Sequence, residues 1–134
     1  MREMFSTRQV ERDAGVQQER LEIWCSRMPI LHPDRIGATR IWSGGQRAAA
    51  IAVASLRRRG VPLRDCAPAA DALQAVDRVD EARAVAKNLA VVRFKRGVRY
   101  PVWRTIDVDQ LDALRRADAI ESAISIGDCL EPRS

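Results

Sequence analysis

The spacing of apolar and polar residues predicts two short helices near the start of the chain. Ser6 and Gln9 have the spacing of a capping box, which begins a helix over Thr7–Ala14. A second helix is expected over Gln17–Arg27, because apolar residues recur there at helical spacing. The apolar residues of this stripe are Leu21, Trp24 and Met28. Two helices joined by so short a connection are typical of a helix-turn-helix.

A hairpin and a longer helix follow. A turn at residues 37–39 between two isoleucines predicts a short β-hairpin. Ser43 and Gln46 have the spacing of a second capping box. An alanine-rich helix with a buried face is then expected from about Gln46 to Arg59, and a glycine ends it.

The second half of the chain predicts helices followed by strands. A fourth helix should start near Pro62 and be interrupted at Pro68. A further helix is expected over Ala69–Asn88, where apolar residues form one stripe. The period of the apolar residues then changes to two, which predicts strands over Leu89–Lys95 and Val98–Trp103.

A tight turn, a last helix and a last strand complete this part. Arg96-Gly97 is expected to be a two-residue hairpin turn. A helix capped by Asp107–Gln110 should end near Ala117. A final strand is predicted by isoleucines at positions 120, 124 and 126. The basic residues between Leu89 and Ile106 are expected to form a solvated face, with a surface for nucleic acid or an acidic partner as the alternative.

The composition excludes several classes of protein. The 134 residues are enough for one domain, or one small domain with an appendage, and 46% hydrophobic residues allow a packed core. The longest apolar run, Ala48–Ala54, is far shorter than the roughly 20 residues of a membrane span. No secretory signal is expected. The three cysteines are odd in number and lack zinc-ligand spacing, so we expect reduced thiols in the cytoplasm.

Positive charge is concentrated in the first half of the chain. Residues 1–64 hold 12 arginines and six acidic residues, a net charge of +6. Residues 65–134 hold 11 basic and 12 acidic residues, a net charge of −1. Arginine suits phosphate binding because its forked guanidinium group is permanently charged. A basic half beside a nearly neutral half predicts a module that binds a polyanion and a second part with another role.

Four short segments of the first half occur in an informative order. They are Phe5–Val16, Leu21–Trp24, Arg40–Ser43 and Leu56–Leu63. In sequence and spacing they resemble the first two helices, the wing-closing segment and the Leu-Arg-x-x-Gly segment of the MerR family of winged helix-turn-helix regulators. Glu22 stands where that family usually has an arginine.

The resemblance implies a division of the chain into two parts. Residues 4–76 would form a winged helix-turn-helix DNA-binding domain, and residues 77–134 a small α+β subdomain. The expected fold class is therefore mainly α with a small β component. The second part would dimerise the protein, bind an effector or hold a partner protein.

The basic half supplies the candidate contacts with double-stranded DNA. In a helix-turn-helix the second helix enters the major groove, so Gln17, Gln18 and Arg20 are the candidates for base contacts. Arg35 and Arg40 flank the hairpin turn and are expected on the DNA backbone, where phosphate contacts position a protein. A homodimer on a two-fold site is expected, because one unit reads few base pairs. Further candidates for the same face are Arg8, Arg27 and Arg47.

The sequence therefore predicts a cytoplasmic bacterial or phage transcription regulator and not an enzyme. His32 is the only histidine, and no catalytic, metal or cofactor motif accompanies it. Cys66 and Cys129 are expected to be buried small side chains, with redox or metal sensing as the alternative. No membrane partner is expected. Two other functions remain open. One is a protein-interaction factor, an antitoxin or phage adaptor, that binds its partner through residues 77–134. The other is an excisionase-like protein that bends DNA.

Overall fold

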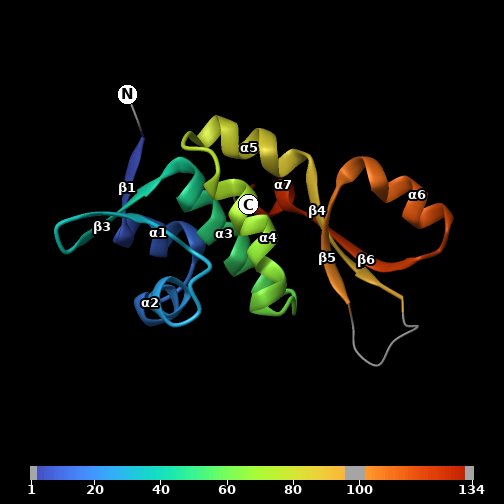
Figure 1. The fold of residues 1–134 in the computed structure, drawn as a ribbon, viewed down its shortest axis with the longest axis horizontal. Coiled ribbons are helices and arrows are strands. Elements are labelled where there is room, and N and C mark those ends of the chain that lie inside the picture. Colours follow the sequence, from blue (N-terminus) through green and yellow to red (C-terminus); the bar gives the residue numbers. More distant parts are fainter. Residues whose placement is uncertain (1–2, 96–101, 132–134) are drawn as a thin grey trace.

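Two small sheets lie at opposite ends of the molecule, with helices between them (Figure 1). The computed structural model describes residues 3–95 and 102–131. Each sheet has three strands, and more of the described residues lie in helices than in strands. The fold is therefore mixed α+β, which confirms the combination of helices and small sheets that the sequence predicts.

The first two predicted helices are present and short. α1 (Thr7–Ala14) has the expected capping box: the Gln9 N–H donates to Ser6 Oγ over 3.2 Å, and the Ser6 N–H donates to Gln9 Oε1 over 2.8 Å. It ends at Gly15, whose φ of 69° is the left-handed conformation of many helix C-caps. α2 (Gln18–Ser26) follows after a short connection.

A three-stranded antiparallel sheet packs beside this helix pair. In the order β1-β3-β2, its strands are β1 (Met4–Ser6), β3 (Thr39–Ser43) and β2 (Asp34–Ile36). β2 and β3 form the predicted hairpin, with Arg35 opposite Arg40. β1 is not among the predicted elements, because three residues are too few to show a period of two. It places Phe5 opposite Trp42, whose indole N–H donates to Thr7 Oγ1 over 3.1 Å.

α3 (Gly44–Arg58) is the central helix of the fold. The predicted capping box is confirmed: the Gln46 N–H donates to Ser43 Oγ over 3.1 Å, and the Ser43 N–H donates to Gln46 Oε1 over 2.8 Å. Most residues of α3 are buried, and the helix contacts α1, β3 and several later elements. Figure 1 accordingly shows α3 in the middle of the molecule.

Two glycines let another part of the chain approach the first turn of α3. The backbone of residues 73–79 lies so close that a Cβ atom on Gly44 would be 2.5 Å from a backbone nitrogen. A Cβ atom on Gly45 would overlap the Val76 carbonyl oxygen. The Gly45 N–H donates to the Asp77 carbonyl oxygen over 3.3 Å. Close packing therefore requires glycine at both positions.

The same contact explains why one predicted helix is two helices. The expected continuous helix over Ala69–Asn88 is wrong. α4 (Leu63–Gln74) ends and α5 (Val79–Lys87) begins around the segment that packs on the glycines. Because the apolar stripe continues through this segment, periodicity alone does not reveal the break.

The predicted interruption at Pro68 is also wrong. α4 continues through Pro68, whose side chain is exposed, although a proline within a helix typically costs about 3 kcal/mol. Burial of other α4 side chains in the core offsets this cost. These buried side chains are Cys66, Ala69, Ala70 and Leu73.

The C-terminal elements form the second antiparallel sheet. In the order β5-β4-β6, its strands are β5 (Trp103–Asp107), β4 (Leu89–Phe94) and β6 (Ile120–Ser125). A 3-10 turn and α6 connect β5 to β6, and α7 follows; their bounds are Val108–Gln110, Leu111–Arg116 and Ile126–Cys129. The predicted first strand, the helix that ends near Ala117 and the final strand are confirmed.

Two predicted strands have different bounds in the structure. The predicted strand over Val98–Trp103 meets β5 only at Trp103, and β5 continues to Asp107. The predicted turn at Arg96-Gly97 and residues 98–101 lie outside the described residues. Ile126 begins α7 and does not extend β6, and its side chain is fully buried in the core.

One apolar core runs through both predicted parts of the chain. Its buried residues extend from Val10 in α1 to Cys129 in α7. Ala82 and Ala86 of α5 belong to this core, and α5 packs against α3. Residues 4–76 and 77–134 are therefore joined by packing as well as by the chain.

Replacing Gly45 with alanine is expected to destabilise the fold strongly. The new methyl group would overlap the carbonyl oxygens of Val76 and Leu73. We expect the free energy of unfolding in urea to fall by about 2 kcal/mol or more, because overpacking of this kind cannot relax without opening the contact. Gly127→Ala is the control, because a Cβ there has its nearest neighbours at 3.6 Å. Equal stability of the two variants would contradict the close packing.

Candidate nucleic-acid interface

α2 and the β2–β3 hairpin enclose a narrow groove. The groove has a volume of about 250 Å³, and the buried Leu21 and Trp42 lie at its base. Polar residues of α2 and β3 also line it, among them Gln18, Glu22 and Arg40. The structure therefore brings the second predicted helix and the predicted hairpin onto one surface.

An ion pair joins α2 to the hairpin across this groove. Arg40 Nη1 pairs with Glu22 Oε2, and Arg40 Nη2 donates to Glu22 Oε1 over 3.0 Å. Ser26 Oγ donates to Glu22 Oε1 over 2.7 Å and accepts from Arg40 Nη2 over 3.2 Å. The Arg40 side chain is only 17% exposed, whereas the Glu22 side chain is 49% exposed. The predicted wing arginine is thus directed toward α2.

The ion pair perturbs the titration of both partners. The pKa of the Glu22 carboxyl is lowered to about 2, chiefly by the hydrogen bond from Arg40 and then by that from Ser26. The positive charge of Arg35 on β2 lowers it further. The hydrogen bond to Glu22 in turn raises the pKa of Arg40. At neutral pH both groups are charged, so together they add no net charge to the surface.

The residues predicted to contact bases lie exposed at the start of α2. They are Gln17, Gln18 and Arg20. The inward side of the helix is also as expected, because Leu21 and Trp24 are buried. Met28, predicted to continue that apolar stripe, is 50% exposed, because α2 ends at Ser26 and the helical period stops with it.

A second cavity lies on the other side of α2, against the C-terminal end of α3. Its volume is about 530 Å³, and Gln17 and Arg20 line it together with Arg57 and Arg58. Arg58 Nη1 donates to the Ala14 carbonyl oxygen over 3.2 Å, which ties α3 to the end of α1. Arg57 and Arg58 are absent from the predicted site, because cations at a helix C-terminus usually interact with the helix dipole. Only the tertiary structure places them beside α2.

The other predicted arginines are not brought to one place. Arg8 on α1, Arg27 after α2 and Arg35 on β2 are exposed. Within residues 3–95 and 102–131, no hydrogen bond or ion pair involves the side chain of Arg8 or Arg27. Arg47 lies away from the groove. Its Nε donates to Asp13 Oδ2 over 2.8 Å, and its guanidinium lies 4.9 Å from the centre of the Phe5 ring.

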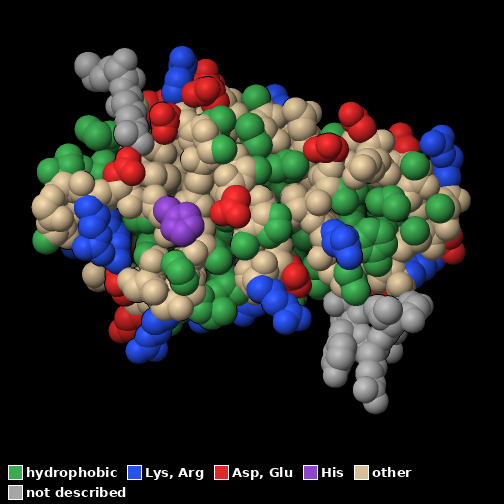
Figure 2. Space-filling view, in the orientation of Figure 1, with side chains coloured by type: hydrophobic (Ala, Val, Ile, Leu, Met, Phe, Trp, Pro, Cys, Tyr) green, Lys and Arg blue, Asp and Glu red, His purple; other side chains and the backbone are tan. Residues whose placement is uncertain are grey.

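Basic side chains do not form one continuous patch on the face shown in Figure 2. On that face, Lys and Arg side chains are separated by acidic, apolar and neutral ones. The uneven charge of the sequence therefore does not by itself mark a binding surface there. The arrangement of α2 and the hairpin is the more informative feature.

Two of the three cysteines, Cys66 and Cys129, are buried. Cys66 is fully buried, and burial raises the pKa of its thiol to about 12. Burial also raises the pKa of Cys129. Thiols that stay protonated at neutral pH are poor nucleophiles. The expectation that both cysteines are buried small side chains is confirmed.

Neither a metal cluster nor a membrane-spanning helix occurs in the described part of the chain. Within residues 3–95 and 102–131, no group of three His, Cys, Asp or Glu side chains is placed to hold a metal ion. No helix in those ranges combines the length and apolar character needed to cross a membrane. His32 is exposed, and its backbone N–H donates to Gln74 Oε1 over 2.7 Å.

Known protein families and the curated proteins give no guide to this surface. No family model matches the chain, and a search of the curated proteins finds no match. The function is therefore inferred from the residues and geometry of the chain itself.

The Glu22–Arg40 pair is expected to make stability fall at acidic pH. The pKa of Glu22 is about 2 in the folded chain and near the ordinary 4.5 in the unfolded chain. The carboxylate therefore stabilises the fold above pH 4.5, and this contribution is lost as the pH falls from 4.5 toward 2. Glu22→Gln should lose less stability than the unmodified chain across that range, measured by urea unfolding at successive pH values.

Glu19→Gln is the matched control for this measurement. Glu19 lies on the same helix and has no ion pair within the described part of the chain. Its variant should keep the acid dependence of the unmodified chain. If Glu22→Gln also keeps it, the ion pair does not persist in solution.

Proposed function

We propose that the protein is a sequence-specific regulator of transcription that binds double-stranded DNA as a homodimer. α2 would enter the major groove, and the β2–β3 hairpin would contact the DNA backbone beside it. This is the arrangement that the resemblance to MerR-like winged helix-turn-helix regulators implies. The cytoplasm is the compartment where such a regulator would work.

The observation that carries the proposal is the joint surface of α2 and the hairpin. An α-helix fits the major groove, and in helix-turn-helix proteins the N-terminal residues of the second helix contact base edges. Gln17, Gln18 and Arg20 occupy this place and are exposed, while Leu21 and Trp24 anchor the helix in the core. Glutamine pairs with adenine through two hydrogen bonds, and arginine does so with guanine.

Exposed arginines of the first half support the proposal through their charge. Arg8, Arg27 and Arg35 are exposed, and phosphate contacts from such residues position a protein on DNA without reading its sequence. Arg40 is a weaker candidate for a phosphate contact, because Glu22 already holds its guanidinium. Arg47 is engaged with Asp13 and Phe5, away from the groove.

A protein partner is the second candidate function, and two apolar side chains favour it. Ile23 is 37% exposed and Met28 is 50% exposed, on or just after α2. Contiguous exposed apolar side chains mark surfaces that bind proteins, and methionine is enriched in such interfaces. Under this alternative, α2 would contact a partner protein, and DNA binding would be secondary or absent.

Selection of bound sequences from random duplex DNA at physiological salt tests the proposed function. We expect a motif with two-fold symmetry, because a homodimer presents two copies of α2. A single half-site should bind more weakly than the complete motif. Recovery of no sequence preference, together with co-purification of a stoichiometric protein partner, would contradict DNA regulation and favour the second candidate.

One variant on α2 and one just after it should separate base contacts from phosphate contacts. Gln18→Ala is expected to relax the sequence preference at one position of each half-site, at a cost of about 1–3 kcal/mol. Arg27→Ala should weaken binding to all sequences and reduce the slope of log affinity against log salt by about 0.9 for each phosphate that the side chain neutralises. Arg64→Ala, an exposed arginine on α4, is the control and should change neither property.

Glu22→Gln should strengthen DNA binding for every sequence. The substitution removes a negative charge from the surface of α2 and releases Arg40 for a phosphate. We expect a higher affinity and a salt slope steeper by about 0.9, measured by fluorescence anisotropy. Weaker binding by this variant would show that the pair with Arg40 is needed to hold the hairpin in place.

A further inference from the structure

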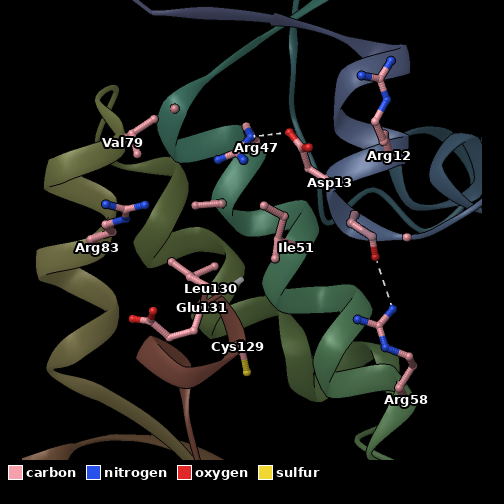
Figure 3. Close-up of a pocket in the computed structure, with 14 residues that line it drawn as sticks. Arg12, Asp13, Arg47, Ile51, Arg58, Val79, Arg83, Cys129, Leu130 and Glu131 are labelled. Carbon is pink, nitrogen blue, oxygen red and sulfur yellow. Dashed lines mark hydrogen bonds and ion pairs between the residues drawn. The ribbon is translucent and has the colours of Figure 1, made fainter. Parts of the chain in front are cut away.

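A cavity of about 500 Å³ lies between α1, α3, α5 and the C-terminal end of α7 (Figure 3). Its lining comes from both predicted parts of the chain. Small-molecule sites in proteins typically have volumes of roughly 300–1,000 Å³. The cavity is separate from the groove between α2 and the hairpin, because the two share no lining residue.

The inner wall of this cavity is apolar. Ala48 and Ile51 contribute to it from α3, Val79 from α5, and Leu130 from the end of α7. Figure 3 shows Ile51 and Leu130 near its centre. Cys129 also lines the wall, and its Sγ donates to the Ser125 carbonyl oxygen over 3.5 Å. This wall suits an apolar molecular body, because covering it removes apolar surface from water.

Arginines outnumber acidic residues around the cavity. Its charged lining consists of Arg12, Arg47, Arg58 and Arg83, with Asp13 and Glu131. Arg47 is fixed by Asp13 over 2.8 Å and Arg58 by the Ala14 carbonyl oxygen over 3.2 Å, the dashed lines of Figure 3. A guanidinium has five N–H donors, so Arg47, which donates to Asp13 through Nε, retains donors for a ligand.

Arg83 is the cation best placed to bind an anion. It extends from α5 toward the cavity in Figure 3, and no hydrogen bond or ion pair involves its side chain within residues 3–95 and 102–131. Asp13 is already paired with Arg47. Glu131 is the other acidic residue of the lining, and its negative charge opposes an anion.

We propose that this cavity binds a small organic anion, a carboxylate or phosphate ester carried on an apolar body. Arg83 and Arg47 supply charge-assisted hydrogen bonds to the anionic group, and the apolar wall covers the body. A neutral apolar compound makes no charge-assisted hydrogen bond to Arg83, and an inorganic anion leaves the wall uncovered. Tight binding therefore requires both parts of the ligand.

Two fluorescent probes that differ in one group test the site. Anilinonaphthalene sulfonate has an apolar aromatic body and an anionic group, and phenyl-naphthylamine has the same body without the charge. With the full chain we expect one-to-one binding of the sulfonate, at least about tenfold tighter than binding of the neutral probe. Near-UV circular dichroism must show native packing throughout, because the sulfonate also binds partly unfolded states.

Substitutions at the charged lining should change the affinity of the sulfonate in opposite directions. Arg83→Gln should weaken it about tenfold and leave the affinity of the neutral probe unchanged. Glu131→Gln should strengthen binding of the sulfonate, because it removes the opposing charge. Arg78→Gln is the matched control, since Arg78 lies at the start of the same helix, pairs with Asp80 and does not line the cavity.

Displacement of the sulfonate identifies the anionic group. Octanoate and octyl phosphate should each displace it, and because both carry an alkyl chain of similar length, the one effective at lower concentration shows whether carboxylate or phosphate is preferred. Inorganic phosphate should be far less effective. Equal affinity for the two probes, unchanged affinity in Arg83→Gln, or displacement by inorganic phosphate as effective as by octanoate would overturn the proposal. No DNA is present, so the result is independent of the proposed function.

Discussion

The backbone of residues 73–79 lies directly against the first turn of α3, and the rest of the fold is arranged around this contact. Because Gly44 and Gly45 have no side chains, α4 and α5 can both pack on α3 while the chain between them turns. The same end of α3 receives β3 through the capping residue Ser43, and α3 packs against α1. One closely packed helix end therefore connects the helix pair, the hairpin and the C-terminal elements.

The arginines of the first half differ in what they are free to contact. Glu22 of α2 forms an ion pair with Arg40 of β3. Asp13 forms an ion pair with Arg47, whose guanidinium also lies against the Phe5 ring. These ion pairs connect α2 to the hairpin and α1 to α3. The positive charges of Arg40 and Arg47 are therefore neutralised within the fold. A net charge counted along the sequence does not distinguish such arginines from exposed ones. Fewer arginines are consequently available to contact an external polyanion than the net charge of the first half suggests.

Signals that act within one helical turn predict the structure well. The capping boxes at Ser6 and Ser43 are confirmed, because each involves only residues close together in the sequence. The break between α4 and α5 is missed, because its cause is a pair of glycines in another helix. In the candidate site, too, local features are predicted and tertiary contacts are missed. Helical spacing predicts that Gln18 is exposed, whereas the pairing of Glu22 with Arg40 depends on how the hairpin folds back on α2.

β1 depends on parts of the chain that are synthesised after it. It pairs with β3, and the adjoining Glu3 accepts a hydrogen bond from the Val79 N–H over 3.4 Å, between residues 76 positions apart. The contact between α1 and α2, in contrast, joins neighbours in the sequence. Local contacts of this kind form faster than distant ones. On the ribosome, β1 therefore reaches its final position only after the helix pair that follows it.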